Sequence, residues 1–258
     1  NKILNAGNSA VTWQDYIDGT LVSNGHAVNS FYSYKFDKLN SEGYPVFKDV
    51  NEKDEDGNAV VHSQQEMFDR AFVYSGKREA DLNGGFSAFL KYKNISLNAL
   101  FSFSFGSNIR LNDLYQSSGQ NLPYPDQNMS SEFVDRWRVP GDEERTNIPV
   151  LSDKSLAIRN SDVTYRIADN GWDMYNKSDL RVVSVSFLRC RSMSIRYDLK
   201  PEWLKPLYLK GASVSFDAGN VFVLKDKALK GRDPEQIGLG SRSIPPQRSY
   251  AVRISLTL

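Results

Sequence analysis

The chain has 258 residues, and 32 lysines and arginines against 31 aspartates and glutamates leave a formal charge of only +1 at pH 7. This balance gives no electrostatic reason to expect a nucleic-acid partner. The sequence also lacks the run of roughly 18 to 20 apolar residues that a membrane-spanning helix needs. One cysteine, Cys190, cannot form an internal disulfide, and two histidines, His26 and His62, are too few for a metal site of the zinc-finger type.

Apolar and polar residues alternate with a period of two in several separate segments, which is typical of β-strands with two different faces. Residues 1–26 show no clear pattern. The first predicted strand covers residues 29–36, in which Tyr32, Tyr34 and Phe36 share one face. Helical periodicity is weak throughout the chain, so an all-β fold is predicted.

A β-hairpin is predicted for the next two strands. Residues 86–93 alternate apart from Phe89, and residues 95–105 alternate apart from Leu100. A very short connection at Lys93-Asn94 joins them, as in tight hairpins. In the second strand the odd-numbered residues are apolar, while most even-numbered residues are Ser or Asn.

Three further long strands are predicted towards the end of the chain, at residues 183–199, 208–224 and 250–258. The last of them alternates without a fault over nine residues. In the strand at 183–199 the alternation loses its phase around Arg189 and Arg191, which indicates a β-bulge. The strand at 208–224 is expected to bend near Gly219-Asn220.

Short and long connections alternate along the predicted strands. The short ones are 93–94 and 200–206, and the long ones are 37–85, 107–180 and 225–247. A structureless connection of more than about 15 residues is unusual in a compact soluble domain. A transmembrane β-barrel has this asymmetry, because tight turns join its strands on one side and long loops join them outside.

The predicted fold is therefore an antiparallel, up-and-down transmembrane β-barrel segment with long extracellular loops. It would supply about six to eight strands of a larger barrel. Its apolar faces would contact lipid, with Phe101, Phe103 and Phe105 pointing outward, and its polar faces would line the interior. The alternative is an antiparallel sandwich in which the apolar faces pack together.

Two pairings follow from this topology. The last strand, 250–258, is expected to pair antiparallel with the strand around 208–216, because sequential strands of an up-and-down barrel are neighbours. Arg253 is expected on the face opposite to Phe101, because a guanidinium cannot comfortably contact hydrocarbon. The segment would leave two unpaired edges and could not close into a barrel by itself.

Seven short motifs occur in the order in which one known family has them. They lie at 43–49, at 83–86 with 91–94, at 136–142 with 147–149, at 186–189 with 195–199, at 219–222, at 231–235 and in the closing strand 250–258. With these motifs the sequence resembles the C-terminal part of the SusC/RagA family of TonB-dependent outer-membrane transporters of Bacteroidetes. The resemblance implies that residues 1–258 belong to the barrel, and that the plug domain and the TonB-contacting segment are not in this chain.

The resemblance also implies a function for the complete protein. It would import a nutrient, an oligosaccharide or a peptide, across the bacterial outer membrane. Its partners would be outer-membrane lipid, a SusD-like surface lipoprotein, and TonB, which it would contact through the N-terminal part. A soluble β-sandwich module that binds carbohydrate is the alternative function, and a sandwich hydrolase is a third hypothesis.

An enzymatic activity has little support in the sequence. Glycoside hydrolysis needs two carboxylates about 5 to 9.5 Å apart, but the segments 86–105, 183–197 and 250–258 contain no Asp or Glu. Neither histidine lies near a nucleophile-elbow sequence, so a Ser-His-acid site is not supported either. We expect no catalytic residue, no cofactor and no metal.

The candidate substrate-binding residues are Arg136, Trp137 and Arg138. The indole could stack on a sugar ring while the guanidinium groups bind its hydroxyls. In the alternative, which we favour, Trp137 anchors a long loop and the arginines pair with a nearby carboxylate, that of Asp135, Asp142 or Glu143.

Three other features have a simpler interpretation. Residues 52–57 partly resemble a calcium-binding loop, but Ser63 occupies the twelfth position, where such a loop has Glu, so a solvated acidic loop is favoured. The Gly-Arg-Asp-Pro-Glu sequence at 231–235 predicts a turn that shapes the outer mouth. Cys190 lies between two arginines, which could make it reactive, but a passive strand residue is favoured.

Overall fold

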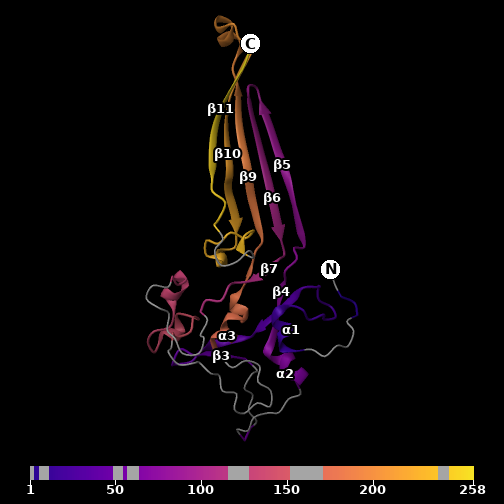
Figure 1. Cartoon of the computed structure of the whole chain (residues 1–258), viewed down its shortest axis with the longest axis vertical. Helices are drawn as coiled ribbons and strands as arrows, with labels where there is room; N and C mark the ends of the chain where they lie inside the picture. Colours follow the sequence, from indigo (N-terminus) through magenta and orange to yellow (C-terminus); the bar gives the residue numbers. More distant parts are fainter. Residues whose placement is uncertain are drawn as a thin grey trace. The chain divides into compact units, whose positions relative to one another are not determined.

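The computed structural model describes residues 3–5, 12–48, 55–56, 64–115, 128–151, 171–237 and 244–258. The chain divides into two compact units (Figure 1). Unit 1 consists of Asn1–Arg78 and Asn108–Val183, and unit 2 consists of Glu79–Ser107 and Ser184–Leu258. None of the described helices is long and apolar enough to cross a membrane.

Unit 2 is built on one five-stranded antiparallel sheet in the order β11-β10-β9-β6-β5. Its strands are β5 (Leu82–Tyr92), β6 (Ile95–Phe105), β9 (Phe187–Asp198), β10 (Gly211–Lys225) and β11 (Ser249–Thr257). Figure 1 shows them as long, neighbouring arrows. All five were predicted from the alternation, with boundaries that differ by a few residues.

The connections of this sheet differ at its two ends. Lys93 and Asn94 join β5 to β6, and Lys93 takes a positive φ of 52° in this tight turn. Helix α4 (Pro201–Leu204) and the 3-10 helix η4 (Lys205–Leu207) join β9 to β10 at the same end. The long segments 107–180 and 225–247 connect strand ends at the other end, as predicted.

Two register shifts confirm the predicted bulge and bend. Against β6, strand β9 contains one extra residue between Ser192 and Cys190, and against β9, strand β10 is irregular between Gly219 and Phe222. Asn220 has a φ of 51° at this irregularity. Bulges re-aim side chains. Arg189 is the register partner of Ser102, and Arg191, two residues further along β9, donates a hydrogen bond to the same serine.

The register gives the sheet one apolar and one polar face. One cross-strand row is Leu90, Leu97, Ile195, Phe216 and Val252. The next row, which points to the opposite face because side chains alternate, is Lys91, Ser96, Arg196, Ser215 and Arg253. The predicted pairing of the last strand is confirmed, and Arg253 does lie on the face opposite to Phe101.

The described residues of unit 1 form three two-stranded sheets, and the last residue of one of them, Ser184, is counted with unit 2. Strand β1 (Ser30–Tyr34) pairs with β4 (Phe72–Lys77), β2 (Phe36–Leu39) with β3 (Pro45–Phe47), and β7 (Asn108–Arg110) with β8 (Val182–Ser184). Its helices are α1 (Trp13–Asp18), α2 (Gln64–Ala71) and α3 (Gly171–Asn176), with the 3-10 helices η1 (Ser131–Asp135), η2 (Asp142–Glu144) and η3 (Asp179–Arg181). The segments interpreted as long loops therefore contain folded structure.

Aromatic side chains form the core of unit 1. Trp172 is 1% exposed and its ring meets that of Tyr115 at 5.3 Å, while Tyr16 stacks on Phe72 at 5.1 Å. Tyr175 belongs to the same core, and burial raises its pKa to about 12. Pairs of this kind stabilise a core beyond the area that they bury.

The strand predicted at 29–36 was expected to belong to the barrel sheet, and this prediction was wrong. The segment is divided between β1 and β2 of unit 1, and it is not a strand of the five-stranded sheet. Its serines are buried as well as its aromatics: Ser30 donates to the Ala27 carbonyl, and Ser33 accepts a hydrogen bond from Arg110. Because small hydroxyls can be satisfied inside a core, the alternation did not mark a solvated face.

Candidate functional site

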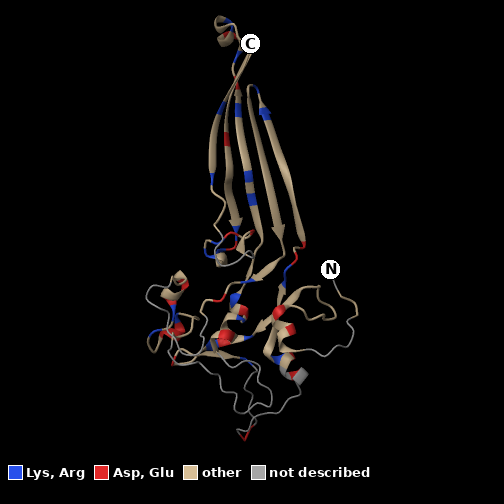
Figure 2. Cartoon of the chain, in the orientation of Figure 1, with Lys and Arg blue, Asp and Glu red and all other residues tan. Residues whose placement is uncertain are grey.

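The apolar face of the five-stranded sheet is exposed. Leu90, Val252, Ile254 and Leu256 are each 63% to 68% exposed, and Figure 2 shows only scattered charges along these strands. The described part of unit 2 contains a single sheet, so no second sheet among these residues covers the face as in a sandwich. A contiguous apolar surface of this kind indicates a contact with lipid or with another protein.

The phenylalanines of β6 lie on this apolar face. Phe101 stacks on Phe86 of β5 with ring centroids 4.8 Å apart, and Phe103 stacks on Phe105 at 5.5 Å. None of the three predicted outward-facing rings is buried, and Phe105 is exposed. The rings therefore contact one another along the sheet surface and do not fill a core.

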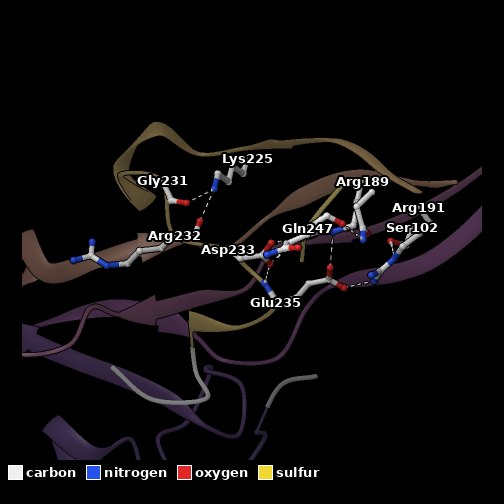
Figure 3. A network of polar contacts seen from close by, with 10 residues as sticks. Ser102, Arg189, Arg191, Lys225, Gly231, Arg232, Asp233, Glu235 and Gln247 are labelled. Atoms are coloured by element: carbon white, nitrogen blue, oxygen red, sulfur yellow. Dashed lines mark hydrogen bonds and ion pairs between the residues drawn. The ribbon is translucent and has the colours of Figure 1, made fainter. Parts of the chain in front are cut away.

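A network of ion pairs lies on the polar face, at the end of the sheet with long connections (Figure 3). Arg189 Nη2 donates to both carboxylate oxygens of Asp233, at 2.7 and 2.6 Å. Arg189 Nε lies 2.6 Å from Glu235 Oε2, in an ion pair that lacks the alignment of a hydrogen bond. The side chains of Arg189 and Asp233 are only 4% and 3% exposed.

Arg191 extends this network to a second strand, β6. Its Nη2 donates to Glu235 Oε1, and its Nε donates to Ser102 Oγ of β6 at 2.8 Å. The carboxylates belong to residues 226–237, which we call the strap. The network thus holds the strap against the polar faces of β6 and β9, and the removal of one partner from such a buried pair costs about 3 to 5 kcal/mol.

The strap has further anchors of its own. Lys225 Nζ donates to the carbonyls of Gly231 and Arg232, at 2.9 and 2.5 Å. Leu229 and Ile237 are buried, and Leu229 belongs to the 3-10 helix η5 (Lys227–Leu229). Gly231 has a φ of 87°, which confirms the turn predicted at 231–235. Its role at an outer mouth stays a prediction.

Trp137 anchors a loop of unit 1. It is 8% exposed, and its Nε1 donates to Glu143 Oε2 at 2.9 Å. A Cβ added to Gly43, which has a φ of 79°, would lie 2.4 Å from the indole, so the ring packs directly on the Gly43 backbone. The indole therefore packs within the protein, in agreement with the favoured interpretation that Trp137 anchors the loop.

The two neighbouring arginines do not bind the groups that this interpretation expected. Arg136 Nη1 donates to the Phe133 carbonyl at 2.9 Å, and Arg138 Nη2 donates to the Val134 carbonyl at 2.5 Å. Both guanidinium groups thus bind carbonyls near the C-terminal end of η1, which have no partner inside such a short helix. The predicted ion pairs with carboxylates of the same loop are not formed.

Two of those carboxylates, Asp142 and Glu143, accept hydrogen bonds from N–H groups of the loop instead. Asp142 accepts hydrogen bonds from the amides of Val139 and Arg138, which lower its pKa. Glu143 accepts from the Trp137 indole and from the Gly141 amide, and the indole is the largest cause that lowers its pKa. The acidic residues therefore shape the loop. Neither guanidinium group forms an ion pair within the described part of the chain, although the charge of Arg138 also helps to lower the pKa of Asp142.

A pocket lies beside these arginines. Its volume is about 520 Å³, and its lining consists of Met129, Ser130, Ser131, Phe133, Val134, Arg136, Arg138 and Leu151. Arg136 and Arg138 are thus brought together at one hollow, while Trp137 is not part of its lining. The substrate-binding role of the three residues stays a prediction.

The other candidates from the sequence, the calcium-like loop and Cys190, form no functional site among the described residues. No group of three or more His, Cys, Asp and Glu side chains that could hold a metal occurs among them, and of the calcium-like loop 52–63 the structure describes only residues 55–56. Cys190 is fully buried. It pairs in register with Phe101 and Phe222, which places it away from its arginine neighbours on the polar face.

Comparison with known proteins gives matches among solved structures. No family profile matches the sequence, and no curated protein does. The RagAB peptide importer in its "closed-closed" state is 21% identical with a TM-score of 0.59, over 91% of this chain and 23% of that one. The "open-open" state of the same importer is 19% identical with a TM-score of 0.55, over 89% of this chain and 22% of that one. A structure of the RagAB peptide transporter is 22% identical with a TM-score of 0.57, over 90% of this chain and 23% of that one.

These matches establish the fold. They confirm the resemblance to the SusC/RagA family that the seven motifs predicted. The matched structures are of a transporter and not of an enzyme. This chain spans less than a quarter of the length of the chains that it matches.

Proposed function

We propose that residues 1–258 form the C-terminal part of the barrel of a SusC-like, TonB-dependent transporter in a bacterial outer membrane. The observation that carries the proposal is the five-stranded sheet with one apolar, exposed face and one polar face. Its strands have 9 to 15 residues, and about 9 to 11 residues are enough to cross a membrane when the strand is tilted. The apolar face would contact lipid, and the polar face would line the barrel.

The two edges of the sheet complete the proposal. Strands β5 and β11 each pair on one side only among the described strands. In lipid an unpaired strand edge leaves backbone groups without hydrogen bonds, at a cost of several kcal/mol each. We therefore place β5 and β11 beside strands of the rest of the barrel, in a complete protein that also carries the plug domain.

The cargo would be a nutrient, an oligosaccharide or a peptide. The likeness to a peptide importer supports the peptide, and the buried ring of Trp137 removes the sugar-stacking surface that favoured the oligosaccharide. The proposed partners are a SusD-like surface lipoprotein and TonB, the latter reached through the N-terminal part. Arg136 and Arg138 would contribute contacts to the substrate, with Trp137 holding their loop in place.

Cell fractionation and uptake test this proposal directly. The protein should be found in the outer-membrane fraction, it should need detergent for extraction, and deletion of its gene should abolish TonB-dependent uptake of labelled peptides. Recovery of the protein from the soluble fraction without detergent would contradict the membrane location. Unchanged uptake of both peptides and oligosaccharides after deletion would contradict the transport function.

A further inference from the structure

We propose that the pocket beside η1 binds a carboxylate together with a neighbouring apolar side chain, as the C-terminal residue of a peptide presents them. The inference rests on the proposed function, because it names the part of a peptide cargo that this surface would hold. Its basis is the chemistry of the lining, which among the described residues contains two arginines and several apolar residues and no acidic residue.

Within the described part of the chain, neither arginine of the pocket forms an ion pair. Arg136 and Arg138 each donate one side-chain hydrogen bond, and both acceptors are neutral backbone carbonyls. A guanidinium group has five N–H donors, so most donors of both groups remain for a ligand. Because Asp142 and Glu143 accept from backbone amides and from an indole, these two carboxylates of the loop are already engaged.

The two guanidinium groups are also held in place before any ligand arrives. Their bonds to the carbonyls of Phe133 and Val134 tie both to the end of one 3-10 helix. Donors that are fixed in advance lose less conformational entropy on binding. Planar guanidinium groups match a carboxylate in paired, charge-assisted hydrogen bonds, so this arrangement favours a carboxylate over a neutral hydroxyl.

The apolar part of the lining selects what accompanies the carboxylate. Met129, Val134 and Leu151 supply apolar surface, and the volume of about 520 Å³ lies within the range of small-molecule sites. Among the described lining residues the one aromatic is Phe133, which is buried against Tyr115 and Trp172, so a sugar ring would find little aromatic surface to stack on here. A peptide end with an apolar side chain uses both the charge and the apolar surface.

Binding of three short peptides to the full-length, detergent-extracted transporter tests the inference. The probes are Ala-Ala-Leu with a free carboxylate, the same peptide with an amidated end, and amidated Ala-Glu-Leu, whose carboxylate is on a side chain. We expect the free acid to bind about tenfold tighter than the amide, or more, because it alone forms charge-assisted hydrogen bonds. Tight binding of the third probe would also support carboxylate binding and would identify an acidic side chain as its source.

Variants locate the site. The double variant Arg136→Gln/Arg138→Gln should remove the preference for the free acid, whereas Arg145→Gln, which changes an arginine of the same loop outside the pocket lining, should preserve it. Equal binding of the free acid and its amide by the unchanged protein would overturn the inference whether or not the variants fold. So would an equal loss of preference in the Arg145→Gln control.

Uptake assays separate this inference from the proposed function. If cells that lack the protein take up peptides normally, the transport function is wrong even where the carboxylate preference holds. If uptake depends on the protein but free and amidated peptides bind equally well, the transport function stands and the carboxylate site is wrong.

Discussion

Strand β1 of unit 1 and strand β6 of unit 2 have similar sequences but opposite environments. Both contain serines among aromatic or aliphatic residues, yet all five residues of β1 are buried, whereas only Ala99 of the eleven residues of β6 is buried. In β1 the hydroxyls bond inside a core, and in β6 they share the polar face with Arg191. Alternation therefore identifies a strand but does not show which of its faces meets the solvent.

The largest effects are expected where a unit depends on a buried aromatic side chain. Trp172→Ala should destabilise unit 1 by about 3 to 5 kcal/mol, because the ring is 1% exposed and contacts Tyr115 and Phe133. The matched control is Trp203→Ala in unit 2, where the indole is 55% exposed, and its effect should stay within about 0.5 kcal/mol. Denaturant unfolding followed by hydrogen exchange measures both, and similar effects would contradict the assignment of the core to unit 1.

The ion pairs of the strap should matter almost as much. Arg189→Met leaves Asp233 buried without its partner and should cost about 3 to 5 kcal/mol. The control is Arg196→Met on the same strand, whose pair with Asp198 is solvent-exposed and contributes about 0 to 1 kcal/mol. A double variant, Arg189→Met with Asp233→Leu, should recover part of the loss; no recovery in its unfolding free energy would show that Asp233 is not the partner that matters.

The two faces of β6 should respond differently to a positive charge. Phe101→Arg should cost about 2 to 4 kcal/mol in a lipid bilayer, if the apolar face meets lipid near the midplane. Asn98→Arg, on the polar face of the same strand, should cost much less; Ser102 is a poorer control because it accepts a hydrogen bond from Arg191. Folding equilibria in lipid vesicles provide the comparison, and equal costs would remove the distinction between the faces.

The smallest effect is the pH dependence of the Trp137 loop. The pKa values of Asp142 and Glu143 are lowered in the folded protein by hydrogen bonds that they accept. Their contribution to stability is therefore present above the unfolded pKa and is lost as the pH falls through the folded pKa. Tryptophan fluorescence at decreasing pH should show the loop loosening in the acid range below about pH 4, and Glu143→Gln should weaken this dependence. A loop that loosens when the pH is raised would contradict this prediction.

The sheet could be predicted from the sequence because its two faces differ along every strand. The five strands, the hairpin at Lys93-Asn94 and the bulge near Arg191 all followed from alternation and its interruptions. The capping box of α1, in which Thr12 and Asp15 bond each other, was not predicted. A threonine followed three residues later by an acidic residue is the local signal that could have indicated this helix start.

The strap and the pocket could not be predicted from alternation. Asp233 lies 44 residues from Arg189, and no local pattern connects an acidic turn to a bulged strand. The phase break that brings Arg189 and Arg191 to one face was the only available signal. The role of Arg136 and Arg138 depended on which groups their guanidiniums bind, and these are carbonyls of η1, which any residue supplies.

Cysteine scanning of β11 in lipid nanodiscs tests the central claim, that one face of the sheet meets lipid, most directly. Single cysteines are introduced at positions 251 to 256 in a Cys190→Ala background and labelled with a fluorophore, and a lipid-attached quencher is added. The account predicts strong quenching on the apolar face, at Val252, Ile254 and Leu256, and weak quenching at Ala251, Arg253 and Ser255, with a period of two. Uniform quenching along the strand, or its strongest values at Arg253 and Ser255, would contradict the claim.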